Sequence, residues 1–100
     1  MASQLDVLRR LISQSFGIHP GDKNRISNVI RQFVEILDNV LEDSLSEGDL
    51  IEIGAVLHEL RLNQYYIYNE VMKRLKNPIK AQDAVQKFKW NQLSRRLRRA

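Results

Sequence analysis

The clearest hydrophobic pattern in the chain lies between Arg25 and Leu45, where apolar residues recur at steps of three and four positions. Polar residues fall between them, and at about 100° per residue the two sets occupy opposite halves of a helix. The apolar set is Ile26, Val29, Ile30, Phe33, Val34, Leu37, Val40 and Leu41. We therefore predict a core helix, capped by Asp22 or Asn24, whose wide apolar face needs at least two neighbouring elements or a second copy of the chain to cover it.

The residues before this helix predict a shorter one, and its apolar residues also share a single stripe. This stripe consists of Leu5, Leu8, Leu11, Ile12 and Phe16. Ser3 is suited to cap the start of the helix. Gly17 is suited to end it, because glycine readily adopts the left-handed conformation that closes a helix. The segment from Ile18 to Gly21 then predicts a loop.

After the core helix, Ser46 and Asp49 stand three residues apart in a variant of the helix-capping pattern. A connection this short predicts that the next helix, starting near Glu47, folds back on the core helix as an antiparallel hairpin.

The third helix is predicted to be long, since its apolar residues keep one helical phase as far as Lys76. These residues are Leu50, Ile53, Leu57, Leu60, Ile67, Val71 and Leu75. Gln64 is the one polar residue in this series. Unbroken phase favours one helix, and the segment from Tyr65 to Leu75 would then extend beyond the end of the core helix.

Asn77 and Pro78 end that helix and predict the start of a fourth, because asparagine caps helices and proline is suited to the first helical position. The apolar residues of this fourth helix form two narrow stripes. One stripe consists of Ile79, Trp90, Leu93 and Leu97, and the other of Ala81, Val85 and Phe88. We expect Trp90 to anchor the helix in the core and the end from Arg95 to Arg99 to fray into solvent.

Together these patterns predict an all-α fold: a small bundle of about four helices built on an antiparallel hairpin of two long helices, without a β-sheet. A chain of 100 residues with four Gly and two Pro fits one such domain. Within it we distinguish an acidic helical body, residues 1–86, from a basic C-terminal helix end, residues 87–100. Apolar surface beyond what short neighbours can cover predicts self-association, most simply as a homodimer.

Composition excludes several classes of protein. The chain has no cysteine, so thiolate chemistry and disulfides are excluded. No apolar run approaches the ~20 residues that a membrane-spanning helix needs. The segment from Met1 to Gln4 lacks the basic cluster and apolar block of an export signal. We therefore expect a protein of the cytoplasm, or of the nucleoid or a host cytoplasm, that is not secreted.

The net charge of +4 conceals a strong segregation. Residues 1–72 hold six Arg or Lys and eleven Asp or Glu, a net charge of −5, whereas residues 73–100 hold ten Arg or Lys and one Asp, a net charge of +9. Clustered positive charge attracts a polyanion, and aromatic side chains can stack on exposed bases. The candidate nucleic-acid-binding residues are Lys87, Lys89, Trp90, Arg95, Arg96, Arg98 and Arg99.

Two other interpretations of the basic end stay open: a solvated chain end, and a surface that binds either an acidic protein or an acidic surface of the same chain. Tyr65 and Tyr66 support the second, because exposed aromatic residues are enriched at protein interfaces. The sequence thus predicts a small accessory or regulatory protein that contacts nucleic acid. The alternative is an adaptor for protein interaction or assembly, of a viral or bacterial accessory type, that acts through its helical surface and basic end.

Catalytic motifs are missing from the sequence. His19 and His58 have no second His or Cys at metal-ligand spacing, and the chain has no glycine-rich phosphate loop. No serine has a base placed to activate it. We therefore expect no enzymatic activity, no metal, no cofactor and no small-molecule substrate.

Overall fold

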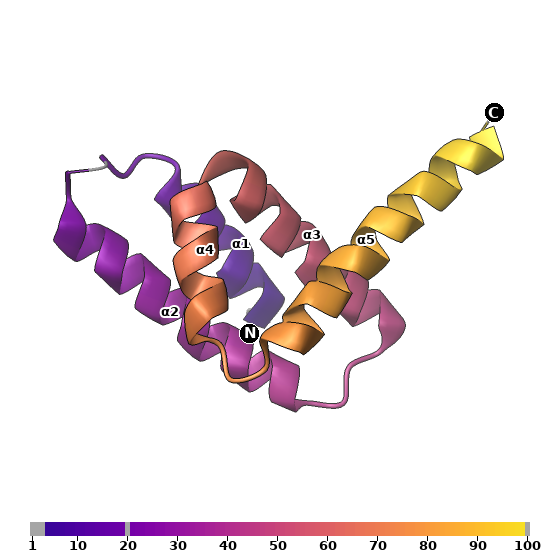
Figure 1. Cartoon of the computed structure of the whole chain (residues 1–100), viewed down its shortest axis with the longest axis horizontal. Coiled ribbons are helices and arrows are strands. Elements are labelled where there is room, and N and C mark those ends of the chain that lie inside the picture. The colour runs from indigo at the N-terminus through magenta and orange to yellow at the C-terminus, as the bar shows by residue number, and fades with distance from the viewer. Residues whose placement is uncertain (1–3, 20, 100) are drawn as a thin grey trace.

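The computed structural model describes residues 4–19 and 21–99, and these residues form five α-helices without a strand (Figure 1). The helices are α1 (Gln4–Ser15), α2 (Lys23–Glu42), α3 (Glu47–Asn63), α4 (Tyr65–Arg74) and α5 (Pro78–Arg99). The prediction of an all-α protein is confirmed. The number of helices is five because the predicted long third helix is divided into α3 and α4.

The core helix α2 forms as its pattern predicts. Of the two candidate caps, Asp22 is the one that acts, since its side chain accepts a hydrogen bond from the backbone N–H of Arg25 at 3.3 Å. Phe33 and Leu37, on the apolar face, are completely buried, whereas Ile26 is only partly buried against the core. In α1, Leu8, Leu11 and Ile12 are buried; the proposed cap Ser3 lies outside the described residues.

Phe16 departs from the predicted stripe of α1. The helix ends at Ser15, whose hydroxyl donates to the backbone carbonyl of Ile12 at 2.7 Å. Phe16 follows in a turn and is 47% exposed, so it belongs to the surface and not to the buried face.

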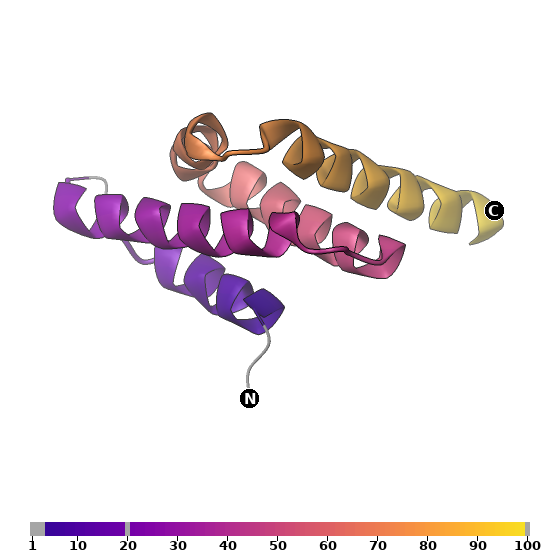
Figure 2. The ribbon, with the colours of Figure 1, turned by 90° about the horizontal axis from the view of Figure 1, so that it is seen from below.

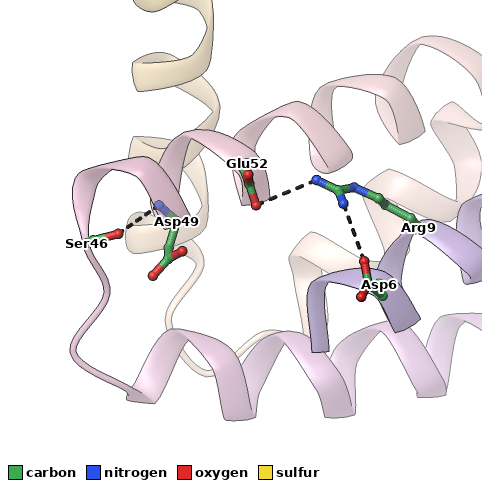
Figure 3. A network of polar contacts seen from close by, with 5 residues as sticks. All are labelled: Asp6, Arg9, Ser46, Asp49 and Glu52. Atoms are coloured by element: carbon green, nitrogen blue, oxygen red, sulfur yellow. Dashed lines mark hydrogen bonds and ion pairs between the residues drawn. The ribbon is translucent and has the colours of Figure 1, made fainter. Parts of the chain in front are cut away.

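A short connection of residues 43–46 joins α2 to α3, and the chain reverses its direction there (Figures 1 and 2). Ser46 caps α3, as predicted, by accepting a hydrogen bond from the backbone N–H of Asp49 at 3.1 Å (Figure 3). The predicted hairpin is therefore present as a reversal. Its two helices, however, have other neighbours as their closest partners: α3 packs most extensively on α5, and α2 packs on α1 and α4.

The prediction of one helix from Glu47 to Lys76 is wrong, because the backbone leaves the helical conformation at Gln64 (φ −141°, ψ 66°). The Nε2 of Gln64 donates to the carbonyl oxygen of Ser15 at 3.1 Å, which ties this break to the end of α1. Leu60 before the break and Ile67 after it are both buried. The apolar residues of the two helices keep one phase because both helices face the same core. The segment that was expected to extend beyond the core helix instead contains α4, which packs on α2.

Asn77 and Pro78 start α5 as predicted. The Asn77 side chain accepts a hydrogen bond from the backbone N–H of Lys80 at 3.1 Å, and Pro78 is the first helical residue. The Nζ of Lys80 donates to the carbonyl oxygen of Leu41 at 2.6 Å and to that of Asp43 at 3.3 Å. A cation at these terminal carbonyls also complements the dipole of α2. These contacts attach the start of α5 to the end of α2.

The crossing of α3 and α5 depends on a glycine. A Cβ atom added to Gly54 would lie 2.6 Å from the carbonyl carbon of Ala84 and 2.9 Å from the Cβ of Phe88, with the Ala84 carbonyl oxygen closer still. Only glycine allows the two backbones to approach this closely. Ala81, Ala84 and Val85 are buried in the contact. The C-terminal half of α5 then projects away from the other helices (Figure 1).

The opposite side of α3 is connected to α1 by a surface ion-pair network (Figure 3). Arg9 lies 3.5 Å from the carboxylate of Asp6 and 3.6 Å from that of Glu52. Its three side chains are about half exposed, so this network adds little to stability compared with the buried residues. None of the helices, within the part of the chain that the structure describes, is long and apolar enough to cross a membrane.

Candidate binding surface

The described residues contain no group of three or more His, Asp or Glu side chains arranged to hold a metal ion. His19 accepts a hydrogen bond on its Nδ1 from the backbone N–H of Gly21 at 3.0 Å. His58 lies in α3 with its ring centroid 5.4 Å from that of Phe88. The two histidines thus have separate local contacts and do not share a site.

The surroundings of His58 shift its pKa. Burial lowers its pKa from the ordinary value of 6.5, and the positive charges of Lys89 and Arg61 lower it further. Its Nδ1 is buried and has no hydrogen-bond partner among the described residues. A neutral imidazole in contact with Phe88 fits these surroundings, because a low-dielectric environment disfavours the charged form.

The most unusual surface feature is the outer side of α5. Its inner side, formed by Ala81, Ala84 and Val85, is buried on α3. The outer stripe, which we define as Ile79, Trp90, Leu93 and Leu97, is 77%, 70%, 45% and 69% exposed, respectively. The two predicted stripes of this helix are therefore separate, and only the one that contains Ala81 and Val85 packs in the core.

The expectation that Trp90 anchors α5 in the core is wrong. Its side chain belongs to the exposed outer stripe, about half a helical turn away from the buried alanines. Phe88 is on the packed side, half-buried near Gly54 and His58. Both aromatic residues belong to one helix pattern, and the sequence gives no signal strong enough to decide which stripe would be covered.

The predicted cations of α5 differ in their surroundings. Lys87 forms an ion pair with Glu47 at the start of α3, with Nζ 3.5 Å from the carboxylate. Lys89 is half-buried, whereas Arg95 and Arg96 are exposed on the projecting half of the helix. Arg98 and Arg99 are within the helical backbone, which continues through the segment predicted to fray, and their side chains lie outside the described part of the chain.

A groove between α3 and α5 brings opposite charges close to Trp90. It is lined by Glu47, Gly48 and Ile51 of α3 and by Gln86, Lys87, Trp90, Asn91, Ser94 and Arg95 of α5. The acidic start of α3 therefore lies beside the basic half of α5. Part of the positive charge of α5 is therefore compensated within the molecule by Glu47.

The two tyrosines predicted as interaction residues lie in different grooves. Tyr65, which is 61% exposed, lines a groove with Ile79 and Gln86 of α5. Its ring centroid lies 6.3 Å from that of Tyr68. Tyr66 lines a groove on α2, together with Ile26 and other residues. The structure therefore brings Tyr65, but not Tyr66, to the outer stripe of α5.

Comparison of the chain with protein-family models, with curated proteins and with solved structures finds no match.

Proposed function

We propose that this chain is a non-enzymatic accessory protein that acts by binding a partner protein through α5. The observation that carries this proposal is the outer stripe, four large apolar side chains in one helical register on a helix that projects from the body. Such surfaces, bordered by polar residues, are typical of protein-interaction sites. Tyr65 extends the apolar surface at the start of α5.

A second candidate function is contact with nucleic acid through the same helix. The observation in its favour is the exposure of Arg95 and Arg96 together with that of Trp90, which combines cations with an aromatic ring available for stacking. Leu93 and Leu97 argue for a protein partner instead, because a phosphate backbone offers nothing apolar to cover them.

Site-specific cross-linking tests the proposal. The chain has no cysteine, so Gln86→Cys, on the exposed side of α5, gives a unique attachment point for a benzophenone cross-linker. Gln32→Cys, exposed on α2, is the matched control. We expect one partner polypeptide to cross-link from position 86 and not from position 32, and a Leu93→Ser/Leu97→Ser background to abolish the product. Identical products from both positions would argue against a specific surface.

The nucleic-acid candidate makes a different prediction. If phosphates are bound, affinity for DNA or RNA falls with salt, at a logarithmic slope of about −0.7 to −0.9 per phosphate contact. Replacement of Arg95, Arg96, Arg98 and Arg99 by Ala then flattens the slope. Loss of the cross-linked product on nuclease treatment would favour this candidate over a protein partner.

Self-association and a cytoplasmic location remain predictions from the sequence. The segment from Tyr65 to Leu75, which was predicted to extend beyond the core helix, instead contains the helix α4, which packs on α2 and α3. Sedimentation at micromolar concentration measures the oligomeric state directly, and a monomer would remove the prediction of a dimer.

A further inference from the structure

The outer stripe of α5 has the spacing of a coiled-coil seam. Two series with seven-residue spacing run along it: Ile79, Gln86 and Leu93 form one, and Asp83, Trp90 and Leu97 form the other. At about 1.5 Å per residue, the seam from Ile79 to Leu97 extends over roughly 27 Å. Four of its six positions are apolar, and the polar Asp83 and Gln86 separate Ile79 from the other three. A narrow, mainly apolar seam on an exposed helix is the surface that a second helix covers in a coiled coil.

On α5 itself, the positions beside this seam carry one sign of charge, whereas Asp83 lies within the seam and Glu47 of α3 lies beside Lys87. The positions beside it are Lys80, Gln82, Lys87, Lys89, Ser94 and Arg96, so cations occur on both sides and acidic residues on neither. In a coiled coil these flanking positions select the partner through charge pairing. Two copies of α5 placed side by side would bring like charges together, which disfavours a symmetric pairing through this seam.

The cations nearest the body are already engaged. Lys80 donates to the carbonyl oxygens at the end of α2, and Lys87 pairs with Glu47. Lys89 and Arg96, beside the distal part of the seam, flank Trp90 and Leu93. The projecting half of α5 therefore combines the exposed apolar residues with the positive charge that a partner can meet.

From this arrangement we propose that the outer stripe of α5 binds an amphipathic helix whose apolar seam is flanked by acidic residues. The inference rests on the proposed function and adds the shape and charge of the partner. An acidic helix covers the apolar residues and pairs with Lys89 and Arg96 at the same time. An acidic surface without apolar residues would meet the charges but would leave Trp90 and Leu97 without apolar contacts.

Trp90 itself provides the assay, because it is the only tryptophan in the chain and is 70% exposed. The probes are two synthetic helical peptides of four heptads with leucine at both seam positions, one with glutamate and the other with lysine at the flanking positions. We expect the glutamate peptide to shift Trp90 emission to shorter wavelength with micromolar affinity. The lysine peptide should bind at least tenfold more weakly.

Two variants test the seam separately from the fold. Leu93→Ser/Leu97→Ser should lower the affinity for the glutamate peptide at least tenfold, and the emission of Trp90 still measures the remaining binding. Leu62→Ser, which removes a leucine of α3 that is as exposed as Leu97, should have no effect. Lys89→Glu/Arg96→Glu should reverse the preference, so that the lysine peptide becomes the tighter one. Circular dichroism checks that each variant is folded.

Several results would overturn the inference: equal affinity for both peptides, no binding of either peptide, or an affinity that Leu93→Ser/Leu97→Ser leaves unchanged. A thymidine oligonucleotide that quenches Trp90 more strongly than the glutamate peptide does, and loses this effect in high salt, would assign the stripe to nucleic acid. A parent dimer that Leu93→Ser/Leu97→Ser converts to a monomer would assign it to a second copy. If both peptides fail while position 86 still cross-links specifically, the helix inference fails and the proposed function stands; if cross-linking fails as well, both fail.

Discussion

Gly54→Ala should destabilise the protein, although alanine is the better helix former. In an exposed helix this change would add about 1 kcal/mol of stability. Here the new methyl group would meet the Ala84 carbonyl group, whose carbon lies at 2.6 Å against an ordinary van der Waals contact of 3.4–4 Å. Because the obstacle is backbone, it cannot rotate away, and α3 and α5 must separate. Overpacking costs about 1–3 kcal/mol, and a cost at the upper limit, less the gain in helix propensity, gives a net loss of about 2 kcal/mol.

Urea unfolding followed by circular dichroism at 222 nm measures this loss. For a domain of this size it corresponds to a melting temperature lower by ~10 °C. Gly48→Ala is the matched control, since Gly48 is in the first turn of the same helix and a Cβ there has only the Ser46 hydroxyl within 4 Å, at 3.8 Å. This variant should be neutral or slightly stabilising. A Gly54→Ala protein as stable as the parent would refute the close crossing of α3 and α5.

Four further measurements test other parts of the fold. Phe33→Ala, at a completely buried site, should cost about 3–5 kcal/mol in urea unfolding, and a change near zero would mean that the wrong face of α2 is inside. Trp90→Ala should leave the free energy of unfolding within about 0.5 kcal/mol of the parent, as surface changes do. Gln64→Ala removes the hydrogen bond to Ser15 and should cost about 1 kcal/mol, whereas a gain of helicity and stability would show that this contact does not hold the break. Burial lowers the pKa of His58, so the imidazole is protonated in the unfolded state before it is protonated in the folded state as pH falls below about 6.5. The free energy of unfolding should therefore decrease between pH 7.5 and 5.5. His58→Gln should make this decrease shallower.

The helix starts could be predicted from the sequence because they depend on local chemistry. Ser46 and Asn77 cap α3 and α5 through contacts three residues away, so the signal lies within one turn. The buried face of α2 could also be predicted, because a broad apolar half-cylinder leaves few other faces that could be buried. Local capping and periodicity therefore gave most of the fold.

The division between α3 and α4 could not be predicted in the same way. Gln64 leaves the helix while its side chain bonds to Ser15, a residue 49 positions earlier in the chain. Periodicity contains no information on that contact, and the buried residues on both sides stay in phase. The only local sign of the break was Gln64 itself, a polar residue in an otherwise apolar series. That it marks a break follows only from the position of α1.

Gly54 carries a similar lesson. The cost of a glycine inside a helix is local and can be read from the sequence, whereas the benefit of Gly54 is tertiary and cannot. Its benefit is the approach of Ala84, which brings the small residues of α5 to α3 and so decides which side of α5 is buried. Small side chains allowed the closest crossing, and the larger side chains of Trp90 and Leu97 were consequently turned outward.

This outward placement links the fold to the proposed function. A close crossing at Gly54 fixes the inner side of α5, so the outer stripe cannot turn into the core without giving up the contact between α3 and α5. The apolar residues of that stripe can therefore be covered only from outside the described fold. Since cations border the stripe, the surface that covers it is expected to carry apolar and acidic groups together. Gly54 therefore permits the close packing of α3 on α5 and, through this packing, determines which side of α5 is exposed.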